Sequence, residues 1–451
     1  MIRPIWYRLR RIRPHTLFLL LIISLVIYCL QLPDSLAEHP EHSTGHHRGL
    51  LVTTPTNSSY PLHYISLDSI HGRLESTSVA ANLGQGRQSV SHLVGHPRRD
   101  DLFYINNEVT PGSIIMGTIQ GMRNLSNVNL NIHSQGPSQG DEPAYSLVTR
   151  DGQHLIAINV RSYSHGQRSA DRQYGSPTAA LYSIEAGGQL QLRQSISLPR
   201  PTWHDNSVIP HPHHIAQHPR DSRTFYIPDL GYNVVYVLRQ TRNKARTSLD
   251  VVQIFDTRTY GGGPRNGVVS HDGMSFCVGE TDEIGKTYFL SFQISSTVMG
   301  IPLDRHNLLQ HTNNHPIYTL PDEVVDAGLF SEGRITHASS DILLLQNQVL
   351  VANRRVVGPY LPTIHRDTIA ISDIRKSRLI PAGHIQTGCW KPRELLIVKR
   401  NRHDLVAVTC NGQEGEGAGV VLFDPSNGYR EVGRWDSEML VSGIVGVTVD
   451  V

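Results

Sequence analysis

The sequence predicts an all-β protein, a seven-bladed β-propeller preceded by an N-terminal apolar segment. Three observations carry this prediction. A strand–turn–strand unit recurs along the chain, long stretches of helical periodicity are missing, and an apolar run without charges follows a cluster of arginines near the N-terminus. We expect residues 1–37 to be a signal peptide or type II signal anchor, 38–49 a linker, and 50–451 the propeller.

The apolar run from Thr16 to Leu32 contains no charged residue. It lies at the short end of the about 17–25 residues that cross a bilayer as a helix. The arginines before it should stay in the cytoplasm, so the propeller would face the lumen or the outside. Ser35-Leu36-Ala37 fits a signal-peptidase site. A secreted protein and a single-pass type II membrane protein both remain open, and membrane contact is expected only through residues 16–32 if they are retained.

The sequons and cysteines suit a lumenal domain. Asn57 and Asn124 each begin an Asn-x-Ser sequon and are candidate glycosylation sites. Four cysteines, one of them in the apolar run, are too few for a disulfide-framework scaffold. Cys389 and Cys410 could form a bridge within one blade, whereas Cys277 is expected to be a small core residue.

The charge distribution argues against a nucleic-acid partner. The formal net charge is +2, but five arginines precede the apolar run, and acidic residues outnumber basic ones in the rest of the chain. A nucleic-acid-binding domain needs a basic patch or stripe, and the sequence contains none.

The recurring unit is an apolar strand, a polar turn and a second apolar strand. Six copies occur, namely VSHLVGHPRRDDLFYINN, AYSLVTRDGQHLIAIN, HHIAQHPRDSRTFYIPD, NGVVSHDGMSFCVG, SDILLLQNQVLVAN and ELLIVKRNRHDLVAV. Their turns, at Pro97, Asp151, Pro219, Asp272, Asn347 and Asn401, are 54, 68, 53, 75 and 54 residues apart. A period near 50 residues is typical of four-stranded propeller blades. Residues 161–175 and 297–335 are expected to form long loops on one face.

The two ends of the chain are predicted to supply the seventh blade. Leu50–Thr53 and Gly443–Val451 are both strand-like runs. Pairing them in one sheet would close the ring and remove the exposed edges of an open array.

Five residues with chemically useful side chains flank the predicted inner strands. His213 begins the third copy, Arg265 begins the fourth and Glu280 ends it, Arg354 follows the fifth, and Arg393 begins the sixth. Because equivalent positions of repeated blades lie at equal heights around the axis, these side chains should converge at the mouth of the central channel. They would form an anion-binding pocket that contains an acid/base group.

Four segments also carry a family resemblance. They are HPHHIAQHPRDSRTFYIPDLGYNVVYV, GGGPRNGVVSHDGMSFCVGE, SSDILLLQNQVLVANR and WKPRELLIV. In this order they resemble segments of the lactonase propellers, which include 6-phosphogluconolactonases and fungal 3-carboxy-cis,cis-muconate lactonizing enzymes (carboxymuconate cyclases). The resemblance extends from about residue 50 to the C-terminus.

The resemblance implies catalytic roles for His213, Arg265, Glu280 and Arg354, and substrate binding by Arg393. The assignment to Glu280 depends on a gap, since an ungapped alignment places Thr281 in that position. The resemblance implies no cofactor. His211 and His213 alternate on an extended strand and could chelate a metal, but no carboxylate or Cys accompanies them at a diagnostic spacing, so we expect no metal site.

The implied function is a lactonase or carboxymuconate cyclase in the secretory pathway, acting on a small anionic lactone or its open-chain acid. His213 would be the acid or base, and arginines would bind anionic groups bidentately. The alternative is a non-catalytic propeller that kept the fold and binds a ligand or a protein. The strand-end arginines would then hold neighbouring blades together.

Overall fold

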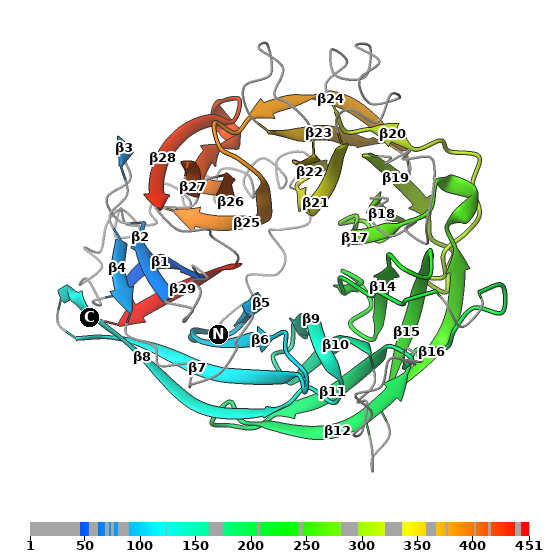
Figure 1. Ribbon diagram of the computed structural model, residues 1–451, viewed down its shortest axis with the longest axis horizontal. Coiled ribbons are helices and arrows are strands. Elements are labelled where there is room, and N and C mark those ends of the chain that lie inside the picture. The colour runs from blue at the N-terminus through cyan, green and yellow to red at the C-terminus, as the bar shows by residue number, and fades with distance from the viewer. Residues whose placement is uncertain are drawn as a thin grey trace, which may run out of the picture. The chain divides into compact units, whose positions relative to one another are not determined.

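The computed structural model describes residues 46–53, 62–67, 72–73, 76–79, 90–122, 124–161, 175–204, 208–242, 247–280, 296–320, 336–357, 367–375, 378–400, 403–413, 416–437 and 443–450. These residues form seven β-sheets, which Figure 1 shows arranged in a ring about a common centre. The predicted all-β propeller is therefore confirmed. No helix in these ranges is both long and apolar enough to span a membrane. The apolar segment and Asn57 lie outside them, as does the side chain of Asn124, the first residue of β8.

The sheets follow one another around the ring in chain order. The first contains β29 (Gly443–Asp450), β1 (His46–Thr53), β2 (Leu62–Ser66) and β4 (Ser76–Val79). The second contains β5 (Val90–His96), β6 (Arg99–Asn107), β7 (Ser113–Met122) and β8 (Asn124–Pro137). The third contains β9 (Asp141–Val148), β10 (His154–Arg161), β11 (Thr178–Ile184) and β12 (Leu190–Ser197). The fourth contains β13 (Ala216–Gln217), β14 (Thr224–Asp229), β15 (Val234–Arg242) and β16 (Thr247–Asp256).

The remaining three sheets complete the ring. The fifth contains β17 (Pro264–Val269), β18 (Ser275–Glu280), β19 (Thr297–Pro302) and β20 (Ile317–Tyr318). The sixth contains β21 (Thr336–Leu345), β22 (Gln348–Val357), β23 (Thr368–Arg375) and β24 (Arg378–Gln386). The seventh contains β25 (Pro392–Arg400), β26 (His403–Gln413), β27 (Glu416–Asp424), β28 (Arg430–Ser437) and the short β3 (Gly72–Arg73). Two short 3₁₀ helices, Arg258–Tyr260 and Pro425–Asn427, follow β16 and β27.

The six sequence repeats are the first two strands of six sheets. Each copy forms an antiparallel hairpin, as in the pairs Val148↔Leu155 and Val269↔Phe276. Alternating apolar side chains from neighbouring sheets pack together, for example Ile156 and Ile158 of β10 with Phe225 of β14. The hydrophobic core therefore lies between the blades, which is why each sheet needs neighbours on both sides.

The histidines of the repeated His-Pro turns join one blade to the next. His96 Nε2 lies 3.0 Å from the carbonyl oxygen of Gly152, and His218 Nε2 lies 3.1 Å from that of Gly273. Nδ1 of each ring accepts a backbone N–H of its own turn, so Nε2 carries the proton and donates it across the blade boundary. The two acceptor glycines have φ angles of 67° and 70°, a region that favours glycine.

The ends of the chain pair as predicted. Strand β29 lies beside β1 in the first sheet, and Leu50 and Val52 pack in one cluster with Ala407, Trp435 and Ile444. Strand β1 begins at His46, inside the predicted linker. This pairing closes the ring between the first and seventh sheets, as Figure 1 shows where blue and red strands meet.

The predicted loop over residues 297–335 is wrong in part. Thr297–Pro302 forms β19 and Ile317–Tyr318 forms β20, the outer strands of the fifth sheet. The run TVMGIP is apolar and almost wholly buried, as a third blade strand must be, because both of its faces meet neighbouring sheets. Residues 281–295 and 321–335 lie outside the described part, as do 162–174 of the other predicted loop.

Candidate active site

A cavity of about 650 Å³ lies among the inner strands of the ring. Its walls come from β5, β9, β17, β21, β22, β25 and β29, from the residue after β6 and from the segment before β13. The polar residues that line it are His92, His96, Glu108, Tyr145, Ser146, His211, His213, Arg265, Asn266, Ser340, Asp341, Arg354, Arg393 and Glu394. Four of the five predicted site residues, His213 and the three arginines, therefore lie around one cavity.

A network of backbone hydrogen bonds holds the segment that carries His213. Buried Asp229, at the end of β14, accepts the His211 N–H at 2.8 Å, and burial raises its pKa to about 7. The His213 N–H donates to the Pro228 carbonyl at 3.1 Å. A Cβ at Gly231 would lie 1.9 Å from a carbonyl oxygen of this segment. The sequence segments PHPHH and PDLG therefore pack directly against each other.

The His213 ring is neutral at pH 7. Burial is the main reason that its pKa lies well below the usual value, and the positive charges of Arg265, Arg354 and Arg393 add to the effect. Nδ1 lies 3.1 Å from Oδ1 of Asn266. The ring also stacks on that of His211, with centroids 5.6 Å apart.

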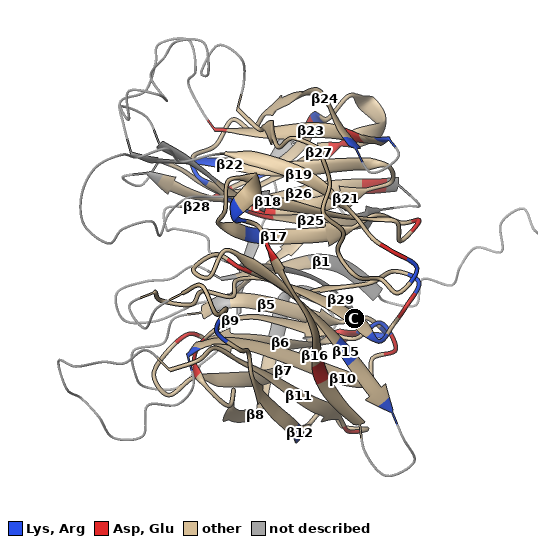
Figure 2. Ribbon diagram, turned by 90° about the vertical axis from the view of Figure 1, so that its right-hand side faces the viewer, with Lys and Arg blue, Asp and Glu red and all other residues tan. Residues whose placement is uncertain are grey.

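Three blades contribute one arginine each. Arg265 lies in β17, Arg354 in β22 and Arg393 in β25, and each is close enough to His213 to lower its pKa. Figure 2 shows basic and acidic positions interspersed along the strands in that view. The cavity thus combines three guanidinium groups with a neutral imidazole.

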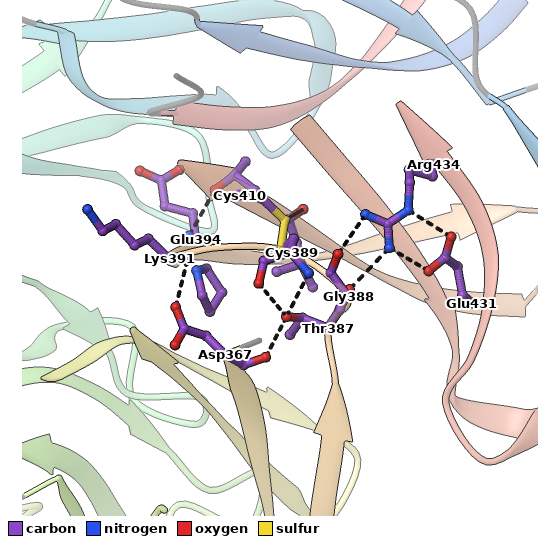
Figure 3. Close-up of a disulfide and its surroundings, with 12 residues drawn as sticks. Asp367, Thr387, Gly388, Cys389, Lys391, Glu394, Cys410, Glu431 and Arg434 are labelled. Carbon is purple, nitrogen blue, oxygen red and sulfur yellow. Dashed lines mark hydrogen bonds and ion pairs between the residues drawn. A yellow bond between two sulfur atoms is a disulfide. The ribbon is translucent and has the colours of Figure 1, made fainter. Parts of the chain in front are cut away.

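A disulfide holds the segment before Arg393. Cys389 and Cys410 are joined, the pairing that the sequence left as a possibility. The carboxylate of Asp367, from the preceding blade, accepts the Lys391 N–H at 2.7 Å, as Figure 3 shows. These links fix the backbone at the start of β25. Cys277 is buried and unbridged, as predicted for a core residue.

The predicted place of Glu280 in the site stays a prediction. Its backbone pairs with Pro264 and with Thr297, and its side chain lies outside the described part of the chain. Two other glutamates line the cavity, Glu108 and Glu394.

Neither glutamate was predicted from the sequence repeats, although a signal existed for each. Glu108 follows Asn107 at the end of β6, as Arg354 follows Asn353 at the end of the fifth copy. Glu394 directly follows Arg393, a residue already singled out. Burial raises the pKa of Glu394 to about 8, and its Oε2 accepts the N–H of Ile444 at 3.0 Å. Burial also raises the pKa of Glu108, against the opposing charge of Arg393.

Six polar residues occupy equivalent positions in six blades, five of them on the inner strand and one just before it. We call this set the polar arc: His92, Tyr145, His214, Asn266, Asp341 and Glu394. The His92 and Tyr145 rings stack with centroids 3.6 Å apart, and Tyr145 lies 4.3 Å from His214. On the other side, Asn266 Nδ2 donates to Asp341 Oδ1 at 2.9 Å. The arc therefore has an aromatic half and a hydrogen-bonded half.

Comparison with known proteins agrees with the fold. A periplasmic gluconolactonase from Pseudomonas aeruginosa has a TM-score of 0.62 at 19% identity, over 89% of this chain and 99% of that one. A putative 6-phosphogluconolactonase from Bacteroides fragilis has a TM-score of 0.57 at 16% identity, over 90% of this chain and 99% of that one. A protein from Lactobacillus plantarum has a TM-score of 0.58 at 17% identity, over 89% and 99%.

These identities establish a shared fold and nothing finer. No curated protein matches the chain. The model of one family, described as "Lactonase, 7-bladed beta-propeller", matches residues 49–434, which include every cavity-lining residue named above except Ile444. The chain belongs to this lactonase family.

Proposed function

We propose that the chain is a hydrolase that opens a small anionic lactone to its hydroxy acid. One observation carries the proposal: a neutral histidine and three arginines from different blades line one cavity. The family adds support, as do the gluconolactonase and the putative 6-phosphogluconolactonase that share the fold.

The arginines suit an anionic substrate. A guanidinium group offers a planar pair of N–H donors that matches a carboxylate or phosphate. Two arginines would bind this anionic group, while the third faces the lactone carbonyl. Arg265 directly precedes Asn266, whose Oδ1 lies 3.1 Å from Nδ1 of His213, so we assign Arg265 to the carbonyl and Arg354 and Arg393 to the anionic group.

In the proposed first step, Nε2 of His213 takes a proton from water while the water oxygen attacks the lactone carbonyl carbon. Because the ring is neutral at pH 7, its lone pair is available for this step. The carbonyl oxygen becomes an oxyanion, which the Arg265 guanidinium stabilises.

In the second step the oxyanion collapses and the ring C–O bond breaks. The departing alkoxide takes the proton that His213 carries, which restores the neutral imidazole. Glu394, with its pKa near 8, is a carboxylic acid at pH 7 and is a second proton donor within the cavity. Glu280 stays our candidate for an alternative base, and Glu108, which lines the cavity, is a further candidate for that role.

The test is a panel of lactones with and without an anionic substituent, together with the open-chain unsaturated acids that a cyclase would use. We expect hydrolysis of anionic lactones, and His213→Ala should lower kcat by about 10²–10⁴-fold, the usual contribution of acid–base catalysis. Exposed His271, in the turn between β17 and β18, provides a control as His271→Gln. Unchanged turnover in His213→Ala would contradict the proposal, and binding without turnover in the native chain would favour the non-catalytic alternative.

We also propose that the propeller resides in the secretory pathway, either secreted or anchored by residues 16–32. The Cys389–Cys410 disulfide supports an oxidising compartment. Removing N-linked glycans should reduce the apparent mass of the native chain, and Asn57→Gln with Asn124→Gln should abolish that difference. A chain that carries no glycan and stays in the cytosolic fraction would rule out this location.

A further inference from the structure

The orientation of one buried amide determines which nitrogen of His213 carries the proton. Asn266 Nδ2 lies 2.9 Å from the Ser340 carbonyl oxygen and 2.9 Å from Asp341 Oδ1. Both neighbours are acceptors, so the NH₂ group must face them. The reversed amide would place its oxygen against two other oxygens in a buried site, at the cost of both hydrogen bonds. Asn266 Oδ1 is therefore the atom that faces His213.

Asp341 is itself held in place as an acceptor. Its Oδ1 accepts the Ile342 N–H at 2.8 Å, and its Oδ2 accepts the Leu395 N–H at 2.7 Å. The carboxylate thus joins β21 to β25, while Asn266 extends the network to β17. Three blades are connected by these hydrogen bonds, which leaves the Asn266 amide little freedom to rotate.

An amide oxygen can only accept a hydrogen bond, so Nδ1 of His213, 3.1 Å away, must be the donor. In a neutral imidazole the other nitrogen then keeps its lone pair. None of the described residues forms a hydrogen bond with Nε2, and the ring lines the cavity.

We propose that Asp341 and Asn266 are positioning residues that hold His213 in its Nδ1–H tautomer, with Nε2 as the base that faces the substrate. The tautomer follows from the geometry alone. Its consequence for turnover rests on the hydrolase proposed above.

The first experiment needs no substrate. Imidazole ¹⁵N NMR of the full chain, with the His213 signals assigned by their absence in His213→Gln, should show a protonated Nδ1 and an unprotonated Nε2. Asn266→Leu removes the acceptor at nearly constant volume and should give a mixture of the two tautomers. A protonated Nε2 in the native chain, or an unchanged spectrum in Asn266→Leu, would overturn the proposal.

A rescue variant and a matched control separate this role from a general effect on folding. In Asn266→Asp an acceptor still faces His213, and the two adjacent carboxyl groups share one proton because both cannot ionise; the Nδ1–H signal should persist. The control is Asn159→Leu. Like Asn266, Asn159 is buried and donates two hydrogen bonds from Nδ2, here to Ser138 and Thr178, but it does not line the cavity. The Asn159→Leu control should leave the His213 spectrum unchanged.

The kinetic readout follows from the tautomer. Asn266→Leu should lower kcat by about 10²-fold with little change in KM, the low end of what acid–base catalysis contributes, whereas Asn266→Asp should restore most of it. A loss confined to KM, or an equal loss in both variants, would refute positioning. If the native chain hydrolyses no lactone, the hydrolase proposal fails, while the NMR result still decides the tautomer.

Discussion

The two halves of the polar arc differ in the contacts that their buried polar residues make. In the aromatic half, the His92 ring stacks on Tyr145 and the His214 ring packs against Tyr145 at a tilt. Within the described chain, Nδ1 of each histidine has no hydrogen-bond partner. In the hydrogen-bonded half, the carboxyl groups of Asp341 and Glu394 accept backbone N–H groups of neighbouring blades. Equivalent positions in repeated blades therefore stabilise the channel wall in two different ways.

The halves also respond to pH in opposite senses. Burial lowers the pKa of His92 and of His214 to about 3, whereas it raises the pKa of Asp341 to about 6 and that of Glu394 to about 8. All four groups are therefore held toward their uncharged forms. Low pH destabilises the aromatic half, because it protonates the buried histidine rings. High pH destabilises the hydrogen-bonded half, because it ionises the buried carboxyl groups.

Two substitutions test this difference between the halves, and His92→Phe should produce the larger change in the pH dependence of the free energy of unfolding. Between pH 6.5 and 3 the unfolded chain binds more protons at His92 than the folded chain, so the native stability falls as the pH falls. Since one pKa unit is about 1.4 kcal/mol, the free energy of unfolding of the native chain should drop between pH 7.5 and 5 by about 2 kcal/mol more than that of the variant. Phe keeps an aromatic ring to stack on Tyr145.

Urea unfolding at the two pH values measures this difference, with His271→Gln as an exposed control that should behave like the native chain. Equal losses of stability in the native chain and in His92→Phe would show that the aromatic half is not the acid-sensitive part of the arc.

The fold could be predicted because its signals are local. Each hairpin carries its own apolar strands and polar turn, and the closing pair β29 and β1 follows from the need to cover two edges. Strand β19 was missed because residues 281–296 separate its apolar run from the hairpin that carries the repeat signal.

In the candidate site, too, the residues that could be predicted are those with a local sequence signal. The repeat register brought His213, Arg265, Arg354 and Arg393 together, and the same register would have found Glu108 beside Asn107. The roles of Asn266 and Asp341 depend on hydrogen bonds between blades, across 74 and 54 residues of sequence. Nothing in either local sequence specifies which oxygen faces which donor, so these roles needed the structure.

Over the single pH unit from 6 to 7, Glu394→Gln should have a smaller effect, of opposite sign. Between pH 4.5 and 8 the folded chain binds more protons at Glu394 than the unfolded chain, so its contribution to stability is lost as the pH rises. From pH 6 to 7 the native chain should lose about 1 kcal/mol that the variant does not lose, because glutamine cannot ionise yet still offers an oxygen to the Ile444 N–H. Urea unfolding at pH 6, 7 and 8 measures the two slopes. Parallel slopes would mean that Glu394 is already ionised at neutral pH, and it would then lose its place as a second proton donor in the cavity.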